Sequence, residues 1–186
     1  MGPAGDGAEL LGPIERGEVV AALAGMANYK AAGCSGCPTE LFKYAIVQED
    51  PEAPLPAEVD VPQHLARLLN ACFETGVVPP WWNRGLVSPL WKLKGDRGDM
   101  ATYRPIAVGE AFSKLYATVL NNRLVPWLER HGLRAPTQAG FRPSLGTSHQ
   151  LFALRHFIDL AARLSQPLYV CFVDLYKAYG TVRRPL

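Results

Sequence analysis

An apolar run near the end of the chain constrains the fold more than any other feature. Residues 169–173 read Tyr-Val-Cys-Phe-Val, a composition typical of a buried β-strand, and Asp174 follows directly. A carboxylate at the end of a rigid strand can hold a divalent cation beside a phosphate without rearrangement of the chain. An isolated aspartate here is more often a turn residue, so the hypothesis of a metal ligand at Asp174 depends on the flanking pattern.

The charge of the chain is divided between its two parts. Residues 1–83 hold four Lys or Arg against eleven Asp or Glu, a net charge of −7, whereas residues 84–186 hold fifteen against six, a net charge of +9. This asymmetry favours a polyanionic partner for the second part, although solvated surface charge would give the same pattern. The sequence shows neither a membrane-length apolar stretch nor a secretory signal, so we expect an intracellular, globular protein with reduced cysteines.

Helical periodicity predicts five helices. They are expected from near Ile14 to Tyr29, after Pro38, from Leu65 to a stop at Gly76, from Ala111 through a bend at Pro126 to Gly132, and from an N-cap at Thr147 to Ala162. An acidic, proline-rich loop at residues 48–62 separates the second from the third. Pro167 then introduces the strand that ends at Asp174.

Two extended segments, residues 86–91 and 103–108, flank a polar stretch that contains glycine. They predict a β-hairpin with a long basic tip, and Pro89 and Pro105 place its strands at edges or beside irregular pairing. Trp81 and Trp82 precede the hairpin. They could stack on bases, but their position after two prolines favours a plug between helix and hairpin.

Three segments, in this order, resemble the finger and early palm motifs of reverse transcriptases, especially those of non-LTR (LINE-like) retrotransposons. They are residues 103–108 with 113–115 (Tyr-Arg-Pro-Ile-Ala-Val and Ser-Lys-Leu), residues 138–142 (Gln-Ala-Gly-Phe-Arg) and residues 172–179 (Phe-Val-Asp-Leu-Tyr-Lys-Ala-Tyr). Upstream, residues 30–40 look like the family's Lys-Ala-Pro-Gly-Pro-Asp-Gly turn, and residues 92–96 like its basic hairpin tip. The chain is thereby identified as an N-terminal fragment of a reverse transcriptase (RNA-directed DNA polymerase) domain.

The resemblance implies roles for the matched residues. Asp174 would be the catalytic residue that binds the metal ions, with a backbone carbonyl ligand from Leu175. Tyr179 would lie under the incoming sugar as a steric gate, and Arg142 would bind the triphosphate. Nucleotidyl transfer fits these residue types, because two metal ions can bridge the attacking and leaving oxygens while arginine offers a planar fork to phosphate.

The resemblance also implies a nucleic-acid surface on the hairpin. Arg104 would lie near the template backbone or the nucleotide, and Lys92, Lys94 and Arg97 would bind nucleic acid. The expected cofactor is Mg²⁺ or Mn²⁺ in the full-length enzyme, with none bound tightly by this fragment. The expected partners are an RNA template, a DNA primer and deoxynucleoside triphosphates, with no membrane and no oligomer, and a nuclear location fits the family.

The departures from the family pattern limit the expected activity. Gly180 replaces the acid that usually follows the gate aromatic, Cys34 and Cys37 replace a proline and an aliphatic residue, and the chain ends before the aromatic-x-Asp-Asp segment. One carboxylate does not hold two neighbouring metal ions, so we expect no polymerase activity from this chain alone.

Other interpretations remain open. The chain could be a non-catalytic retroelement remnant that acts at most as a nucleic-acid-binding module. Asp174 could also belong to a phosphotransfer hydrolase, which would need a second acid nearby. Cys34 and Cys37 could suggest zinc or redox chemistry, but no second pair has ligand spacing, which favours incidental thiols.

The expected fold is α+β: the fingers and an incomplete palm of a right-hand polymerase, helix-rich, with a β-hairpin and a terminal palm strand. We expect a helical N-terminal extension leading into the fingers over residues 1–83, and fingers with the basic hairpin and long helices over residues 84–165. Residues 166–186 would hold the first palm strand and the start of the active site. A palm strand without sheet neighbours predicts marginal stability and poor solubility.

Overall fold

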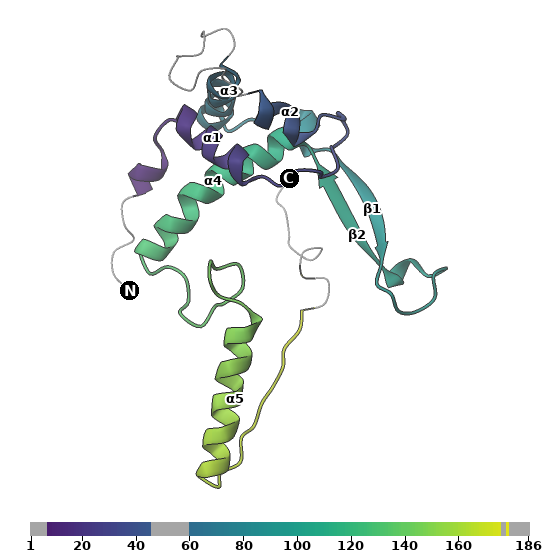
Figure 1. The fold of residues 1–186 in the computed structure, drawn as a ribbon, viewed down its shortest axis with the longest axis vertical. Coiled ribbons are helices and arrows are strands. Elements are labelled where there is room, and N and C mark those ends of the chain that lie inside the picture. The colour runs from purple at the N-terminus through teal and green to yellow at the C-terminus, as the bar shows by residue number, and fades with distance from the viewer. Residues whose placement is uncertain (1–6, 46–59, 176–177, 179–186) are drawn as a thin grey trace. The chain divides into compact units, whose positions relative to one another are not determined.

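The computed structural model describes residues 7–45, 60–175 and 178 of the 186-residue chain (Figure 1). It divides into two compact units, Met1–Leu133 and Arg134–Leu186. In the first unit the described helices are α1 (Arg16–Gly25), α2 (Thr39–Tyr44), α3 (Val61–Thr75) and α4 (Ala111–Arg130), with short 3-10 turns at Gly7–Leu10, Pro80–Asn83 and Met100–Thr102. Its strands are β1 (Gly85–Trp91) and β2 (Tyr103–Gly109), and the second unit contains α5 (Thr147–Arg163).

The core of the first unit forms where α1 packs against α3 and α4. Apolar residues recur at helical spacing on each of these helices and are almost completely buried, with exposed fractions of 0 to 5%: Val19, Leu23, Leu65, Leu69, Leu115 and Val119. Each such side chain contributes about 1.5 to 3 kcal/mol by leaving water. The predicted helical periodicity of the first unit is confirmed, but α1 ends at Gly25 and not near Tyr29 as expected.

Local signals set the ends of α3. The carboxylate of Asp60 accepts a hydrogen bond from the backbone N–H of Gln63 at 3.2 Å, and Gly76 closes the helix in the left-handed conformation at φ 67°. The stop predicted at Gly76 is therefore confirmed. The helix begins at Val61, inside the loop expected over residues 48–62, and residues 46–59 of that loop lie outside the described part of the chain.

Arg123 on α4 holds the segment that precedes α1. Its guanidinium donates to both carboxylate oxygens of Glu18 at 2.6 Å, and also to the backbone carbonyls of Gly12 and Pro13 at 2.6 Å. A guanidinium can donate several hydrogen bonds in one plane, so Arg123 both orients the segment before α1 and neutralises the carboxylate of Glu18. The start of α1 is thus attached to the helix that follows the hairpin.

The two strands pair antiparallel, with Gly85 opposite Gly109 and Pro89 opposite Pro105. The N–H of Lys92 donates to the carbonyl of Thr102 at 2.9 Å, so hydrogen-bonded pairs alternate from there and Pro89 and Pro105 form a non-hydrogen-bonded pair. At such a pair the N–H groups point away from the partner strand. The prolines therefore cost the hairpin no bond, and each removes a donor from an outer edge, as predicted.

The junction between helices and hairpin is aromatic. Trp82, 3% exposed, stacks on Phe112 at 5.9 Å between ring centroids, and Trp81 meets Phe112 edge to face at 5.4 Å. Phe42 approaches the same ring at 4.6 Å. The predicted plug is confirmed for Trp82, whereas Trp81 contacts Phe112 but stays 40% exposed.

The second unit differs from the prediction in two places. Helix α5 begins at Thr147 with Gly146 as its N-cap, one residue earlier than expected. In the described residues 166–175 no strand is formed, so the predicted terminal strand is wrong for this structure. A strand is stable only where a neighbour accepts and donates its backbone hydrogen bonds, and β1 and β2 pair with each other.

The coarse fold class is confirmed, since the described residues are rich in helix and contain one two-stranded antiparallel sheet. The described helices are too short or too polar to cross a membrane.

Candidate nucleic-acid interface

The tip of the β1–β2 hairpin is shaped by two aspartates. Asp96 accepts from the N–H of Gly98 at 2.9 Å, and Asp99 accepts from the N–H of Ala101 at 2.8 Å. Gly95 has φ 80°, and a Cβ there would lie 2.7 Å from a methyl carbon of Thr102. Both acids of the tip thus help to build the turn, and they keep their negative charge beside Lys94 and Arg97.

Lys92 and Arg104 lie on the same face of the hairpin. Arg104 is opposite Leu90 on β1. Lys92 directly follows β1 and continues the pairing through its N–H bond to Thr102, so the two cations are diagonal neighbours, about 7 to 8 Å apart between their Cα atoms. Arg104 is exposed, and the Nζ of Lys92 donates to the carbonyl of Ala101 at 2.6 Å. The structure therefore brings together two of the predicted contact residues on one open strand face.

Arg97 lies against the opposite face. Its guanidinium carbon is 4.5 Å from the ring centroid of Trp91, and the hydroxyl of Tyr103 donates to the Arg97 carbonyl at 2.9 Å. Trp91 and Tyr103 are paired across the strands, and their side chains leave the hairpin on the face away from Lys92. Arg97 is thus separated from Lys92 and Arg104, and it is held by a cation–π contact. Lys94 is exposed in the tip.

In the second unit, Arg142 is bound to its own loop. It donates to the carbonyls of Ala135 at 3.1 Å and Gln138 at 3.4 Å, while Arg134 donates to the carbonyl of Phe141 at 2.9 Å. The two guanidinium groups thereby fold residues 134–142 into a compact loop. The residue assigned to the triphosphate is half-buried and is oriented by backbone carbonyls.

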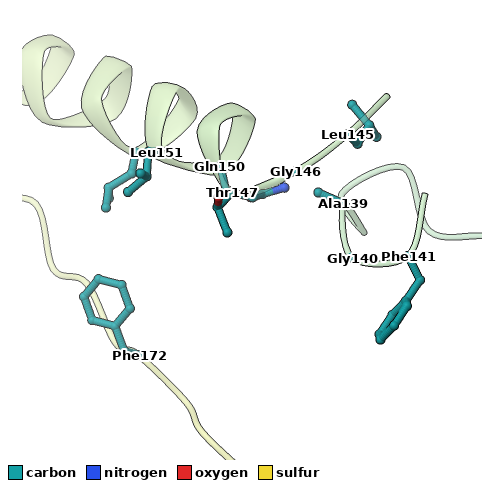
Figure 2. A pocket seen from close by; sticks show the side chains of 10 residues that line it. Ala139, Gly140, Phe141, Leu145, Gly146, Thr147, Gln150, Leu151 and Phe172 are labelled. Carbon is teal, nitrogen blue, oxygen red and sulfur yellow. The ribbon is translucent and has the colours of Figure 1, made fainter. Parts of the chain in front are cut away.

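A pocket of about 650 Å³ lies beside this loop, at the start of α5 (Figure 2). Its lining is mostly apolar: Phe141 comes from the loop, Leu151 from α5 and Phe172 from the segment that follows the helix, and Thr147 and Gln150 are its polar members. Phe141 has φ 58° and is 88% exposed. The pocket thus brings the second and third matched motifs together within one unit.

Asp174 and Leu175 follow Phe172 and are both exposed. Tyr179 lies outside the described residues. Within the described part of the chain, no three His, Cys, Asp or Glu side chains are grouped so that they could hold a metal ion. One carboxylate and one carbonyl fall short of the roughly six oxygens that Mg²⁺ requires, so these two residues do not make a metal site by themselves.

A buried carboxylate that the sequence interpretation missed joins the hairpin to the turn at residues 33–37. Glu110, only 1% exposed, accepts from the N–H of Ser35 at 2.9 Å and from its hydroxyl at 2.5 Å. The hydrogen bond from the Ser35 hydroxyl lowers the pKa of Glu110 against the opposing effect of burial. Burial, followed by the charge of Glu110, raises the pKa of the Cys37 thiol, which argues against a reactive thiolate there.

The signal for Glu110 in the sequence is weak. An acid directly before a helix is common, and Glu110 precedes the first residue of α4. Its partner Ser35 is 75 residues away, beyond the reach of any local pattern.

Comparison with known proteins finds similarity to polymerases of mobile elements. It is 25% identical over 174 residues to a probable RNA-directed DNA polymerase from transposon X-element of Drosophila melanogaster, a match that covers 91% of this chain and 17% of the relative. It is 25% identical to the RNA-directed DNA polymerase from mobile element jockey and to a probable RNA-directed DNA polymerase from transposon BS of the same organism. These matches cover 66% and 64% of this chain and 13% of each relative.

No family model matches the chain. The chain spans less than a fifth of the length of these relatives. The recognition made from the motifs is confirmed: this chain is related to the reverse transcriptases of non-LTR retrotransposons.

Proposed function

We propose that the chain is part of an RNA-directed DNA polymerase, with the fingers over residues 84–165 and the start of the palm over residues 166–186. In this proposal the β1–β2 hairpin contacts the nucleic acid that is copied. The single observation that carries it is the placement of Lys92 and Arg104 as diagonal neighbours on an open strand face. The relatives, which are named as RNA-directed DNA polymerases, support the same assignment.

The charge of the hairpin suits a phosphate backbone. Residues 84–109 hold five Lys or Arg and two Asp, and both aspartates accept hydrogen bonds from the tip backbone. Cations that neutralise phosphates release condensed counterions, so binding to this face should weaken steeply with salt. Exposed Leu90 and Ile106 lie among these cations and can contact bases or sugars.

In the longer polymerase, Asp174 and the Leu175 carbonyl are proposed to supply part of the site for Mg²⁺ or Mn²⁺. Arg142 is proposed to bind the triphosphate and Tyr179 to discriminate against the 2′-hydroxyl. These roles come from the resemblance of the motifs. A 186-residue chain with this ligand set is proposed to show no polymerase activity on its own.

A non-catalytic nucleic-acid-binding module is the second candidate. Two observations favour it. No described residue of α5 is buried, and the described residues 166–175 form no strand. Both candidates predict that the purified chain does not extend a primer with Mg²⁺ or Mn²⁺, so a primer-extension assay tests the inactivity that they share. Any templated product would contradict the proposed inactivity.

Binding to a fluorescein-labelled single-stranded RNA, followed by anisotropy across a salt series, tests the interface. The double variant Lys92→Ala/Arg104→Ala should weaken binding and reduce the slope of log K against log salt by about 1.4, at about 0.7 per phosphate contact. Arg67→Ala is the matched control, because Arg67 is an exposed cation on α3, away from the hairpin. An equal loss in the control and the hairpin variant would show non-specific attraction and would contradict the proposal.

A further inference from the structure

The β1–β2 hairpin is attached to the helices mainly through its two ends. Every residue of β1 and β2 is exposed or half-buried, so little packing holds the strands along their length. The start of β1 follows Trp82, which is buried against Phe112. The end of β2 leads directly into Glu110, the buried residue before α4.

Glu110 is surrounded by the turn at residues 33–37. Its two oxygens accept from the N–H and the hydroxyl of Ser35, and that hydroxyl oxygen in turn accepts from the N–H of Cys37 at 3.2 Å. Gly33 packs so closely that a Cβ there would lie 2.7 Å from the carboxyl carbon of Glu110 and 2.9 Å from its Cα. One carboxylate therefore joins this turn, the base of the hairpin and the first turn of α4.

We propose that Glu110 is a positioning residue, whose contact with Ser35 fixes the direction of the hairpin and so determines where Lys92 and Arg104 meet nucleic acid. The inference rests on the nucleic-acid-binding function proposed above. Seven strand residues extend about 23 Å, so a rotation of 10° at the base displaces the tip by about 4 Å. A displacement of that size exceeds the tolerance of a hydrogen bond to phosphate.

The test compares RNA binding by four variants with that of the parent chain at one ionic strength. Glu110→Ala should raise the dissociation constant by about two- to thirtyfold, the range expected for a residue that acts through another. Ser35→Ala removes the hydroxyl from the same contact and should change binding in the same direction. The double variant Glu110→Ala/Ser35→Ala should bind RNA no more weakly than Glu110→Ala alone, because the two substitutions break the same contact.

Glu110→Gln is the conservative variant. Its amide oxygen can still accept from the Ser35 N–H, so it should bind RNA more tightly than Glu110→Ala. Hydrogen exchange at the amides of Ser35 and Cys37 should quicken in Glu110→Ala and slow again in Glu110→Gln. A residue with a structural role alone would change the midpoint of unfolding but not the binding of molecules that remain folded.

Tryptophan fluorescence shows whether each variant is folded at the assay temperature. Should Glu110→Ala not fold, Ser35→Ala and Glu110→Gln decide the question. Parent-like RNA binding by folded Glu110→Ala or by Ser35→Ala, together with weakened binding in Lys92→Ala/Arg104→Ala, overturns the positioning role and leaves the interface intact. Parent-like binding in Lys92→Ala/Arg104→Ala overturns both proposals.

Discussion

Gly33→Ala is the sharpest test of how the turn at residues 33–37 is packed. The added Cβ would lie 2.7 Å from Cδ, 2.8 Å from Oε1 and 2.9 Å from Cα of Glu110. Side-chain atoms can move aside, but the Cα belongs to the backbone at the start of α4, so the turn itself has to shift. Overpacking of this kind costs about 1 to 3 kcal/mol.

The free energy of unfolding can be followed by urea titration with tryptophan fluorescence. The signal reports on the first unit because all four tryptophans lie in it: Trp81, Trp82, Trp91 and Trp127. With a loss of about 2 kcal/mol and a denaturant slope of about 2 kcal/mol per M, Gly33→Ala should lower the urea midpoint by about 1 M.

Gly17→Ala is the matched control. Gly17 lies within α1, and a Cβ added there meets nothing within 4 Å. The same substitution should therefore stabilise the protein, by about 0.5 to 1 kcal/mol, because alanine loses less backbone entropy in a helix. An unchanged or raised midpoint in Gly33→Ala, alongside the expected rise in Gly17→Ala, would refute the crowding at Glu110.

Three further predictions concern the first unit. Leu69→Ala, at a residue with 0% exposure, should lower the free energy of unfolding by about 2 to 5 kcal/mol, whereas a loss below 1 kcal/mol would show that the site collapses around the cavity. The hydrogen bond from Arg123 lowers the folded pKa of Glu18 below its ordinary value of 4.5, so its stabilisation is present above that pH and is lost as the pH falls through the folded pKa. Urea midpoints between pH 6 and pH 3 should therefore decline less in Glu18→Gln than in the parent, and parallel declines would contradict the ion pair's contribution. Pro89→Val with Pro105→Val restores an outward N–H on each edge of the hairpin, so light scattering should detect concentration-dependent association that the parent lacks, and an unchanged scattering profile would show that the edges are protected in another way.

Much of the first unit follows from local chemistry that the sequence states directly. Gly76 ends α3 because glycine enters the left-handed conformation without a Cβ clash. The hairpin follows from two extended segments around a turn rich in glycine and aspartate, and its prolines fall at a pair where no ladder bond is lost. The similarity to reverse transcriptases was likewise predicted from short motifs in a defined order, and the polymerase relatives confirm that prediction.

The sequence did not determine whether residues 169–173 form a strand. Their composition is that of a buried strand, but in the structure these residues are exposed and form no strand. Strand propensity measures fit to a sheet, so it has an effect only where neighbouring strands provide hydrogen bonds and cover. The environment of Asp174 therefore depends on tertiary partners more than on its own segment.

The sequence by itself therefore indicated the helices, the hairpin and the similarity to reverse transcriptases, because each signal is carried by residues close together in the chain. Only the tertiary structure decided that Glu110 meets Ser35 and that Lys92 and Arg104 share a face from which Arg97 is excluded. The physical reason is twofold. A buried carboxylate needs hydrogen-bond donors, and these can come from residues far away in the sequence. Strand register assigns side chains to the faces of the hairpin only once the two segments have paired.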